Sequence, residues 1–150
     1  ATDAGEECGV DLPALQKETL KKLGEVMPVW APVRNPIDTW SAIEQHGSKK
    51  ATSHIARCLM AQPDVDALLI TFVLMPESMF DISEAFTEIF RRHPHKPVFA
   101  SYYGGTAREI AHIHEGFAAL GVPCYPTPER AVFAFGRMVE YARFRGVIRK

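Results

Sequence analysis

The stretch Ala67-Leu-Leu-Ile-Thr-Phe-Val73 decides the fold class of this chain. It is a continuous apolar run rich in residues that favour strands, which is typical of a strand covered on both faces. Two further runs, 97–103 and 121–125, follow at intervals of roughly 25 to 30 residues, about the length of one strand and one helix. This spacing predicts a parallel sheet with residues 67–73 at its centre.

Helical periodicity fills the intervals between these runs. Apolar side chains recur at spacings of three and four residues, namely Ala51, Ile55 and Leu59; Ile82, Phe86, Ile89 and Phe90; Ile110, Ile113, Phe117 and Leu120; and Val132, Phe135, Val139 and Ala142. Three residues are predicted to cap helix starts, namely Asp81, Thr106 and Thr127. Strands that alternate with helices of these lengths predict a three-layer α/β/α fold with a doubly wound parallel sheet.

The first third of the chain has weaker signals. Residues 1–7 read as the end of a helix that stops at Gly9, and residues 17–23 as a short helix. The prolines between residues 28 and 36 predict an extended path, because proline fixes its own φ and restricts the residue before it. A chain that opens inside a helix is expected to be a fragment, so residues 1–150 are interpreted as one domain of a larger multidomain protein.

Composition limits the classes of partner. The chain has 150 residues, 47% of them hydrophobic and 23% charged, with a formal net charge of −1. No broad positive field exists, so neither nucleic acid nor a membrane is an expected partner. No apolar run is long enough to span a bilayer. Cys8, Cys58 and Cys124 lack the spacing of a zinc site or a disulfide framework, which favours a reducing cytoplasm.

Chemistry is expected in the loops at the carboxyl ends of the strands, where open parallel sheets bind ligands. The candidate site residues are Asn35, Pro36 and Asp38; Pro76, Glu77 and Ser78; Gly104, Gly105 and Thr106; and Thr127 and Glu129. Three of these loops run into a helix whose free N–H groups could hold a phosphate or carboxylate. A tight turn explains the two glycines equally well, and Asp38 could simply cap a turn.

No catalytic or metal-binding set is predicted. His112 and His114 lie two apart on a predicted helix, so they point to opposite sides and cannot share a metal. His93 and His95 lie among cations at a helix end, where solvated positions are expected. The chain also lacks a nucleophile elbow, a Walker loop and a dinucleotide fingerprint.

The order of several motifs resembles the NDP-forming acyl-CoA synthetases, which include the ADP-forming acetyl-CoA synthetases and, more distantly, succinyl-CoA synthetase. The motifs are Asn35-Pro-Ile-Asp38, Gly104-Gly105 and Thr127-Pro-Glu-Arg-Ala131, together with Leu12-Pro-Ala-Leu15 and Gln62-Pro-Asp-Val65. The resemblance covers nearly the whole chain. It implies the second flavodoxin-like ligase domain of such an enzyme, without the first strand that domains of this type have.

The resemblance also implies a function. The family makes acyl-CoA from a carboxylic acid, CoA and ATP, through an acyl phosphate and a phosphohistidine. Its other domains bind CoA, carry the histidine and, as an ATP-grasp domain, bind the nucleotide. This domain would then hold no cofactor alone, while the parent enzyme uses ATP or ADP, magnesium and CoA.

The role that the resemblance implies for this domain is support. The helix start after Pro76-Glu77-Ser78 would point at the phosphohistidine across a domain interface, although Glu77 would repel a phosphate unless it faces away. The isolated domain is expected to be inactive.

Two other classes of function stay open. One is a non-catalytic regulatory or interaction domain, such as the same domain fused to a lysine acetyltransferase. The other is a free-standing flavin-binding or receiver-like domain, although the chain lacks the early phosphate loop of the first and the acidic cluster of the second. Assembly into a homo-oligomer is also open, because a partner chain could fill the place of the missing strand.

Overall fold

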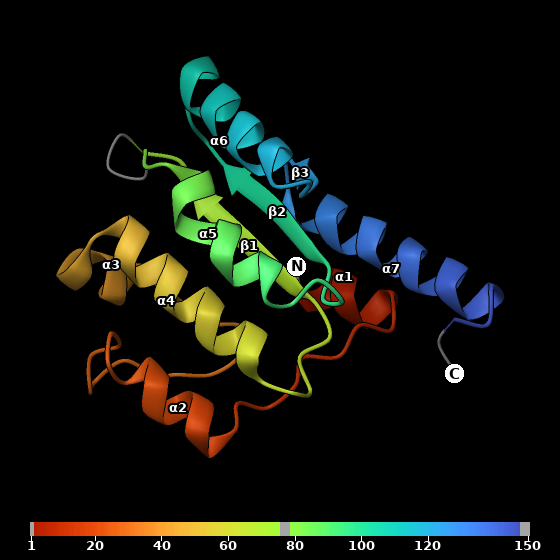
Figure 1. Cartoon of the computed structure of the whole chain (residues 1–150), viewed down its shortest axis with the longest axis horizontal. Coiled ribbons are helices and arrows are strands. Elements are labelled where there is room, and N and C mark those ends of the chain that lie inside the picture. The colour runs from red at the N-terminus through yellow and green to blue at the C-terminus, as the bar shows by residue number, and fades with distance from the viewer. Residues whose placement is uncertain (1, 76–78, 148–150) are drawn as a thin grey trace.

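The computed structural model describes residues 2–75 and 79–147, and this part of the chain contains seven helices and three strands (Figure 1). In chain order these elements are α1 (Thr2–Glu7), α2 (Lys17–Leu23), α3 (Trp40–His46), α4 (Ser48–Ala61), β1 (Leu68–Val73), α5 (Ile82–Arg91), β2 (Val98–Tyr103), α6 (Ala107–Ala119), β3 (Cys124–Tyr125) and α7 (Pro128–Phe144). Among these helices, none combines the length and the apolar character that crossing a bilayer requires.

The three strands form one sheet in the order β1-β2-β3, and both pairings are parallel. Leu68 pairs with Val98 and Val73 with Tyr103, so β1 and β2 match over their full lengths. The predicted parallel α/β fold is confirmed. β3 is only two residues long because the preceding residues complete the end of α6, where the N–H of Val122 bonds to the carbonyl of Phe117.

The prediction that residues 67–73 lie at the centre of the sheet is wrong for the part of the chain that the structure describes. Within residues 2–75 and 79–147, β1 has a strand partner on one side only. Thr71 and Val73 are exposed, and Val73 keeps 56% of its surface accessible. In these residues β1 is therefore an edge strand, and part of its apolar surface is exposed.

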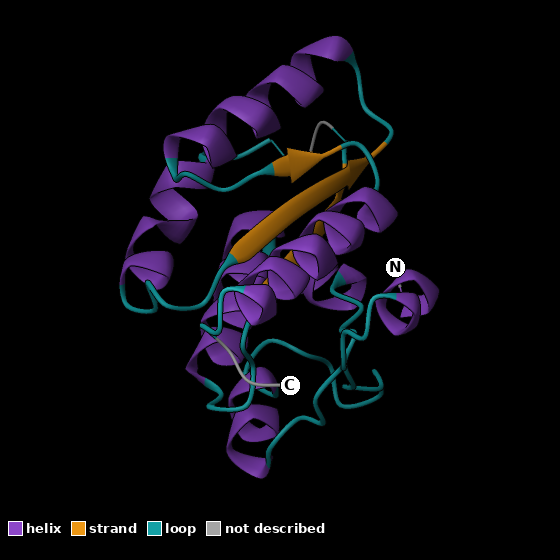
Figure 2. Ribbon diagram, turned by 90° about the vertical axis from the view of Figure 1, so that its right-hand side faces the viewer, coloured by secondary structure: helices purple, strands orange, loops and turns teal. Residues whose placement is uncertain are grey.

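Helices cover both faces of the sheet, which gives the predicted three layers (Figure 2). On one face, β1 packs against α4, α5 and α6 in the main hydrophobic core; the rings of Phe72 and Phe117 lie 5.8 Å apart. On the other face, the ring of Phe99 lies 5.5 Å from that of Phe135 on α7. α1 packs against α7 on this second face, where Cys8 lies against Gly136.

The predicted caps begin the three helices that follow the strands. Asp81 accepts a hydrogen bond at 2.8 Å from the backbone N–H three residues later, at the start of α5. Thr106 and Glu109 form a complete capping box at the start of α6. Thr127 caps α7, with Pro128 as the first helical residue. Each cap satisfies N–H groups that have no partner inside the helix, so these starts are encoded locally.

The first third forms a second, smaller core against the outer side of α4. Its fully buried members come from α2, α3, α4 and the loop after α2, namely Leu23, Val26, Met27, Ala42, Ala51, Ile55 and Cys58. Helix α2 spans the predicted residues, whereas α3 was not predicted. The segment from residue 28 to 39 contains no strand, and its Asn35–Pro36 peptide bond is cis.

Candidate functional site

The carboxyl ends of the strands meet at one edge of the sheet, which we call the carboxyl edge. It consists of residues 74–75, 79–81, 103–106 and 125–128, together with residues 38–40, because Trp40 lines a hollow with Met75 and bonds to Asp38. The N–H of Leu74 donates to the carbonyl of Tyr103 at 2.9 Å, so the loops after β1 and β2 begin side by side. Of the predicted site residues, Asp38, Gly104, Gly105, Thr106 and Thr127 lie in these loops, whereas Asn35 contacts Pro13. Pro76, Glu77 and Ser78 lie outside the described residues.

Gly104 and Gly105 form a tight turn between β2 and α6. Their φ angles are 64° and 90°, which favour glycine. A Cβ atom on Gly105 would lie 2.8 Å from Cβ of Leu74, so this glycine also allows the two neighbouring loops to pack closely. The backbone geometry therefore explains why glycine occupies both positions without a bound ligand.

The start of α6 is occupied by a carboxylate of the same chain. Oε2 of Glu109 accepts hydrogen bonds from the backbone N–H of Thr106 at 2.6 Å and from its hydroxyl at 2.9 Å. Glu109 is largely buried. The negative charge of this side chain lies where an anionic ligand would otherwise meet the free N–H groups, so phosphate binding at this helix start is disfavoured.

The starts of α7 and α5 carry carboxylates too. Hydrogen bonds from its own backbone N–H and from the Thr127 side chain lower the pKa of Glu129, which favours its charged form. Asp81 is the N-cap of α5. Each of the three helices that follow a strand thus has a negative side chain in its first turn or at its cap. This arrangement argues against direct phosphate contact at these starts.

Two side-chain hydrogen bonds fix the loop that contains Asn35, Pro36 and Asp38. The side-chain amide of Asn35 donates to the carbonyl of Pro13 at 3.2 Å, which fixes the loop to the segment before α2. Oδ1 of Asp38 accepts from the N–H of Trp40 at 3.0 Å and stabilises the start of α3. This geometry supports the interpretation of Asp38 as a turn cap.

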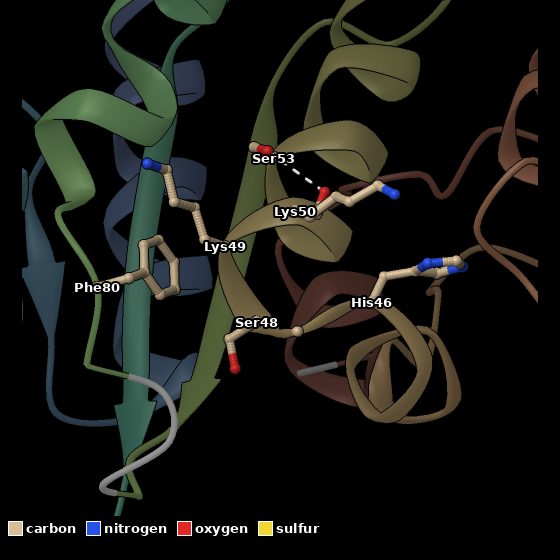
Figure 3. A pocket seen from close by; sticks show the side chains of 7 residues that line it. His46, Ser48, Lys49, Lys50, Ser53 and Phe80 are labelled. Carbon is tan, nitrogen blue, oxygen red and sulfur yellow. Dashed lines mark hydrogen bonds between the residues drawn. The ribbon is translucent and has the colours of Figure 1, made fainter.

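Two hollows lie where the start of α4 meets the loop after β1. One, of about 410 Å³, is lined by His46, Gly47, Ser48, Lys49, Lys50, Ser53 and Phe80 (Figure 3). The other, of about 430 Å³, is lined by Trp40, Ile43, Glu44, Gly47, Ser48 and Met75. None of these residues was predicted as a site residue. The available signal was that α4 follows Gly47 and has no acidic residue in its first turn.

The cations of the first hollow do not converge. Nζ of Lys49 lies 2.5 Å from Oε1 of Glu84 and links α4 to α5. Figure 3 shows Lys49 on the side of Phe80, whereas Lys50 and His46 point away from it. Among the residues drawn there, no nucleophile and base face each other. The hollow therefore provides surface shape and some positive charge, without an arrangement for catalysis.

The histidines have structural surroundings. Nε2 of His112 lies 2.8 Å from the carbonyl oxygen of Phe80, while the ring of His114 packs edge-on against Tyr102. Burial, together with the nearby Lys96, lowers the pKa of His93. In residues 2–75 and 79–147, no three side chains of histidine, cysteine, aspartate or glutamate form a cluster that could hold a metal ion.

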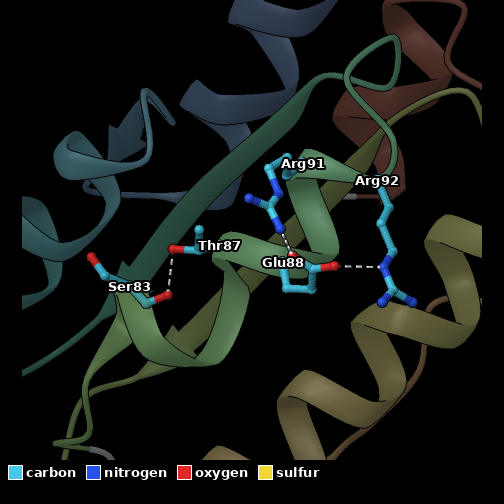
Figure 4. A network of polar contacts seen from close by, with 5 residues as sticks. All are labelled: Ser83, Thr87, Glu88, Arg91 and Arg92. Carbon is cyan, nitrogen blue, oxygen red and sulfur yellow. Dashed lines mark hydrogen bonds and ion pairs between the residues drawn. The ribbon is translucent and has the colours of Figure 1, made fainter.

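The basic residues at the end of α5 pair with a carboxylate. Arg91 and Arg92 both donate hydrogen bonds to the carboxylate of Glu88, which lies about one helical turn before them (Figure 4). Hydrogen bonds from Arg92 and Arg91 lower the pKa of Glu88. All three side chains are exposed, so this network belongs to a solvated helix end.

Comparison with known proteins gives ADP-forming acetate-CoA ligases among the relatives of this chain. The chain is 28% identical over 145 residues to ADP-forming acetate-CoA ligase II of Archaeoglobus fulgidus, covering 96% of the chain and 21% of the relative. It is 29% identical to the alpha subunit of ADP-forming acetate-CoA ligase I of Pyrococcus furiosus, covering 97% and 30%. The chain thus spans a third or less of these relatives' length. No protein-family model matches it.

Solved structures have the same fold. The ADP and phosphate complex of the dinucleotide forming acetyl-coenzyme A synthetase 1 of Ca. Korarchaeum cryptofilum superposes with a TM-score of 0.76 at 25% identity, over 97% of this chain and 30% of that one. A protein of Pyrococcus horikoshii OT3 superposes with a TM-score of 0.78 at 25% identity, over 95% and 32%. Over nearly its whole length, the chain is therefore homologous to one segment of the ADP-forming acetate-CoA ligases, which are NDP-forming acyl-CoA synthetases.

Proposed function

We propose that this chain is a ligase module of an NDP-forming acyl-CoA synthetase. One observation carries the proposal: the match to ADP-forming acetate-CoA ligases extends over 96% of the chain rather than over one motif. The shared α/β fold supports it. Fold alone would not, because doubly wound domains host many unrelated functions.

The proposed overall reaction joins a carboxylic acid to CoA at the expense of ATP. ATP transfers its γ-phosphoryl group to a histidine of another domain, and ADP leaves. The histidine passes that group to the carboxylate of the acid, which gives an acyl phosphate and restores the histidine. The CoA sulfur then attacks the acyl carbon, phosphate leaves, and the thiol proton passes to the released phosphate or to water. The products are acyl-CoA, ADP and phosphate.

In this reaction the described residues have a supporting role. The carboxyl edge carries no converging nucleophile and base, and carboxylates occupy the starts of α5, α6 and α7. Direct contact with a transferring phosphoryl group is therefore disfavoured at these starts. We assign to the carboxyl edge the task of packing against the histidine-bearing domain and holding the phosphohistidine site in place.

Activity is tested on the whole polypeptide from which this chain comes. Purified and supplied with acetate or another short acid, CoA and magnesium ATP, it should form acyl-CoA and ADP in equal amounts. Both products are separated by chromatography, and omission of CoA or of the acid is the control. The 150-residue chain alone should form neither. A whole polypeptide that binds CoA or nucleotide yet turns over no acid would favour the regulatory alternative instead.

The supporting role is tested by hydrogen exchange. Backbone amides of residues 38–40 and 103–107 should exchange more slowly in the whole polypeptide than in the isolated chain, because a neighbouring domain would cover the carboxyl edge. Amides of residues 92–96, at the opposite edge, are the matched control and should change little. Equal exchange at the carboxyl edge in both samples would contradict the role, even if the enzyme were active.

A further inference from the structure

The outward face of α7 carries an exposed stripe of two aromatic and two charged side chains. Phe133, Arg137, Glu140 and Phe144 follow one another at spacings of four, three and four residues, which places them on one side of the helix. Phe133 is 45% and Phe144 87% exposed, and the Arg137 and Glu140 side chains are 80% and 60% exposed. We call these four residues the α7 stripe.

The stripe borders the side by which α7 packs on the rest of the chain: Gly136, three residues after Phe133 and four before Glu140, is covered by Cys8. Val132 and Gly136 are buried, and Phe135 contacts Phe99 of β2. In Figure 1, α7 runs along the outer side of the molecule. Phe144, which is 87% exposed, therefore contributes little to packing within the described residues, whereas Phe133 is partly covered. Aromatic and arginine side chains on an open surface are the types most enriched at protein interfaces.

The stripe is also self-complementary. A two-fold axis that passes beside α7, perpendicular to the helix and level with the midpoint between Met138 and Val139, places position 133 of one copy opposite position 144 of the other and position 137 opposite position 140. An antiparallel second copy would therefore place ring against ring at both ends and opposite charges against each other in the middle. The 2.7 Å contact between Nη1 of Arg137 and Oε2 of Glu140 within the chain shows that these charges lie close together on the surface.

We propose that the α7 stripe is a homodimer interface. The α7 helices of two copies lie antiparallel, Phe133 packs against the partner's Phe144, and Arg137 pairs with the partner's Glu140. The same contacts occur twice across the axis, which is the isologous arrangement of a closed dimer. This inference is independent of the proposed enzyme function.

One helix face gives a small interface. Stable specific complexes bury about 1,200–2,000 Å² in total, and a single pair of helix faces lies at or below the lower end of that range. We therefore expect a weak dimer that forms as protein concentration rises. Sedimentation equilibrium of the 150-residue chain over a wide concentration range should show the mass rising from the 16.7 kDa of one chain toward twice that value.

Charge reversal tests the pairing. Arg137→Glu places two glutamates opposite two glutamates, and Glu140→Arg places two arginines opposite two arginines, so each variant alone should stay monomeric. The double variant Arg137→Glu/Glu140→Arg restores opposite charges and should dimerise as the natural chain does. Circular dichroism should show the same helix content in all four proteins.

Mixing the two single variants is the decisive experiment. A mixed pair has opposite charges at both contacts, so an equal mixture should form a heterodimer although each component is monomeric. The mixture cannot repair the contact within either chain, and this separates an interface from a local effect on the helix. A natural chain that stays monomeric at every concentration, or a mixture that stays monomeric, would overturn the proposal.

Discussion

The ammonium nitrogen of Lys96 lies 2.7 Å from the backbone carbonyl oxygen of Gln62 and 2.9 Å from that of Met60. Lys96 is only 9% exposed. Its charge therefore lies at the end of α4, where carbonyl groups have no partner within the helix and the helix dipole is negative. This contact fastens the loop before β2 to the end of α4.

Replacing Lys96 by methionine should destabilise the fold. Lys96→Met keeps most of the apolar side chain but leaves two buried carbonyl oxygens without their donor, which we expect to cost about 2–3 kcal/mol. Urea unfolding followed by circular dichroism measures the change. Lys50→Met removes an exposed lysine of α4 and should stay within about 0.5 kcal/mol of the natural chain. Equal unfolding midpoints for both variants would contradict this assignment.

The two glycines after β2 should differ in their tolerance of alanine. Both have positive φ, so each substitution introduces backbone strain of about 1–2 kcal/mol. Only at Gly105 would the new Cβ also meet Leu74 at 2.8 Å, whereas Gly104 faces open space. Gly105→Ala should therefore destabilise the chain by about 1–3 kcal/mol more than Gly104→Ala. Thermal or urea unfolding of the pair gives the difference, and a ligand-binding role alone predicts none.

The features predicted correctly from the sequence are encoded by neighbouring residues. Thr106 and Glu109 are three residues apart and cap the same helix start, so their pattern was sufficient to place α6. The apolar run that became β1 likewise needs only its own residues. Strands, helix starts and the layer order could therefore be derived from local patterns.

The features that were missed depend on distant residues. Gln62 joins the segment before α2 to the end of α4 across 46 residues, through its bond with the N–H of Gln16, and no local pattern reveals it. The sheet-edge position of β1 depends on which strands lie beside it. The site was predicted from loop positions alone, although the capping-box pattern of Thr106 and Glu109 places a carboxylate at the α6 start, where it disfavours an anion.

The pairing of Asp64 with two amides should appear in the pH dependence of stability. Hydrogen bonds from Gln62 at 2.7 Å and Gln16 at 3.2 Å lower the pKa of Asp64 below the ordinary 3.8, the Gln62 bond contributing most. The native state therefore prefers the charged form. The resulting stabilisation is complete above the unfolded-state pKa and is lost as pH falls through the lower, folded-state pKa.

The variant Asp64→Asn tests this dependence. The difference in unfolding free energy between the natural chain and the variant should be constant near neutral pH and should shrink in acid, below the ordinary pKa of an aspartate. Urea titrations at a series of pH values measure it. Asp66→Asn removes an exposed carboxylate two residues away and is the matched control. A difference that stays the same from neutral pH into acid would contradict the assignment.

Cys124 should react slowly with alkylating reagents in the folded chain. Burial raises the pKa of its thiol to about 11, from an ordinary value of 9.0. Because the thiolate is the reactive form, native Cys124 should react roughly a hundredfold more slowly at neutral pH than the same thiol in the urea-unfolded chain. Its rate should continue to rise up to about pH 11, whereas the unfolded thiol should level off near its ordinary pKa. Iodoacetamide labelling followed by peptide mass spectrometry resolves this thiol from Cys8 and Cys58. A native rate that levels off near pH 9 would show that burial does not control this thiol.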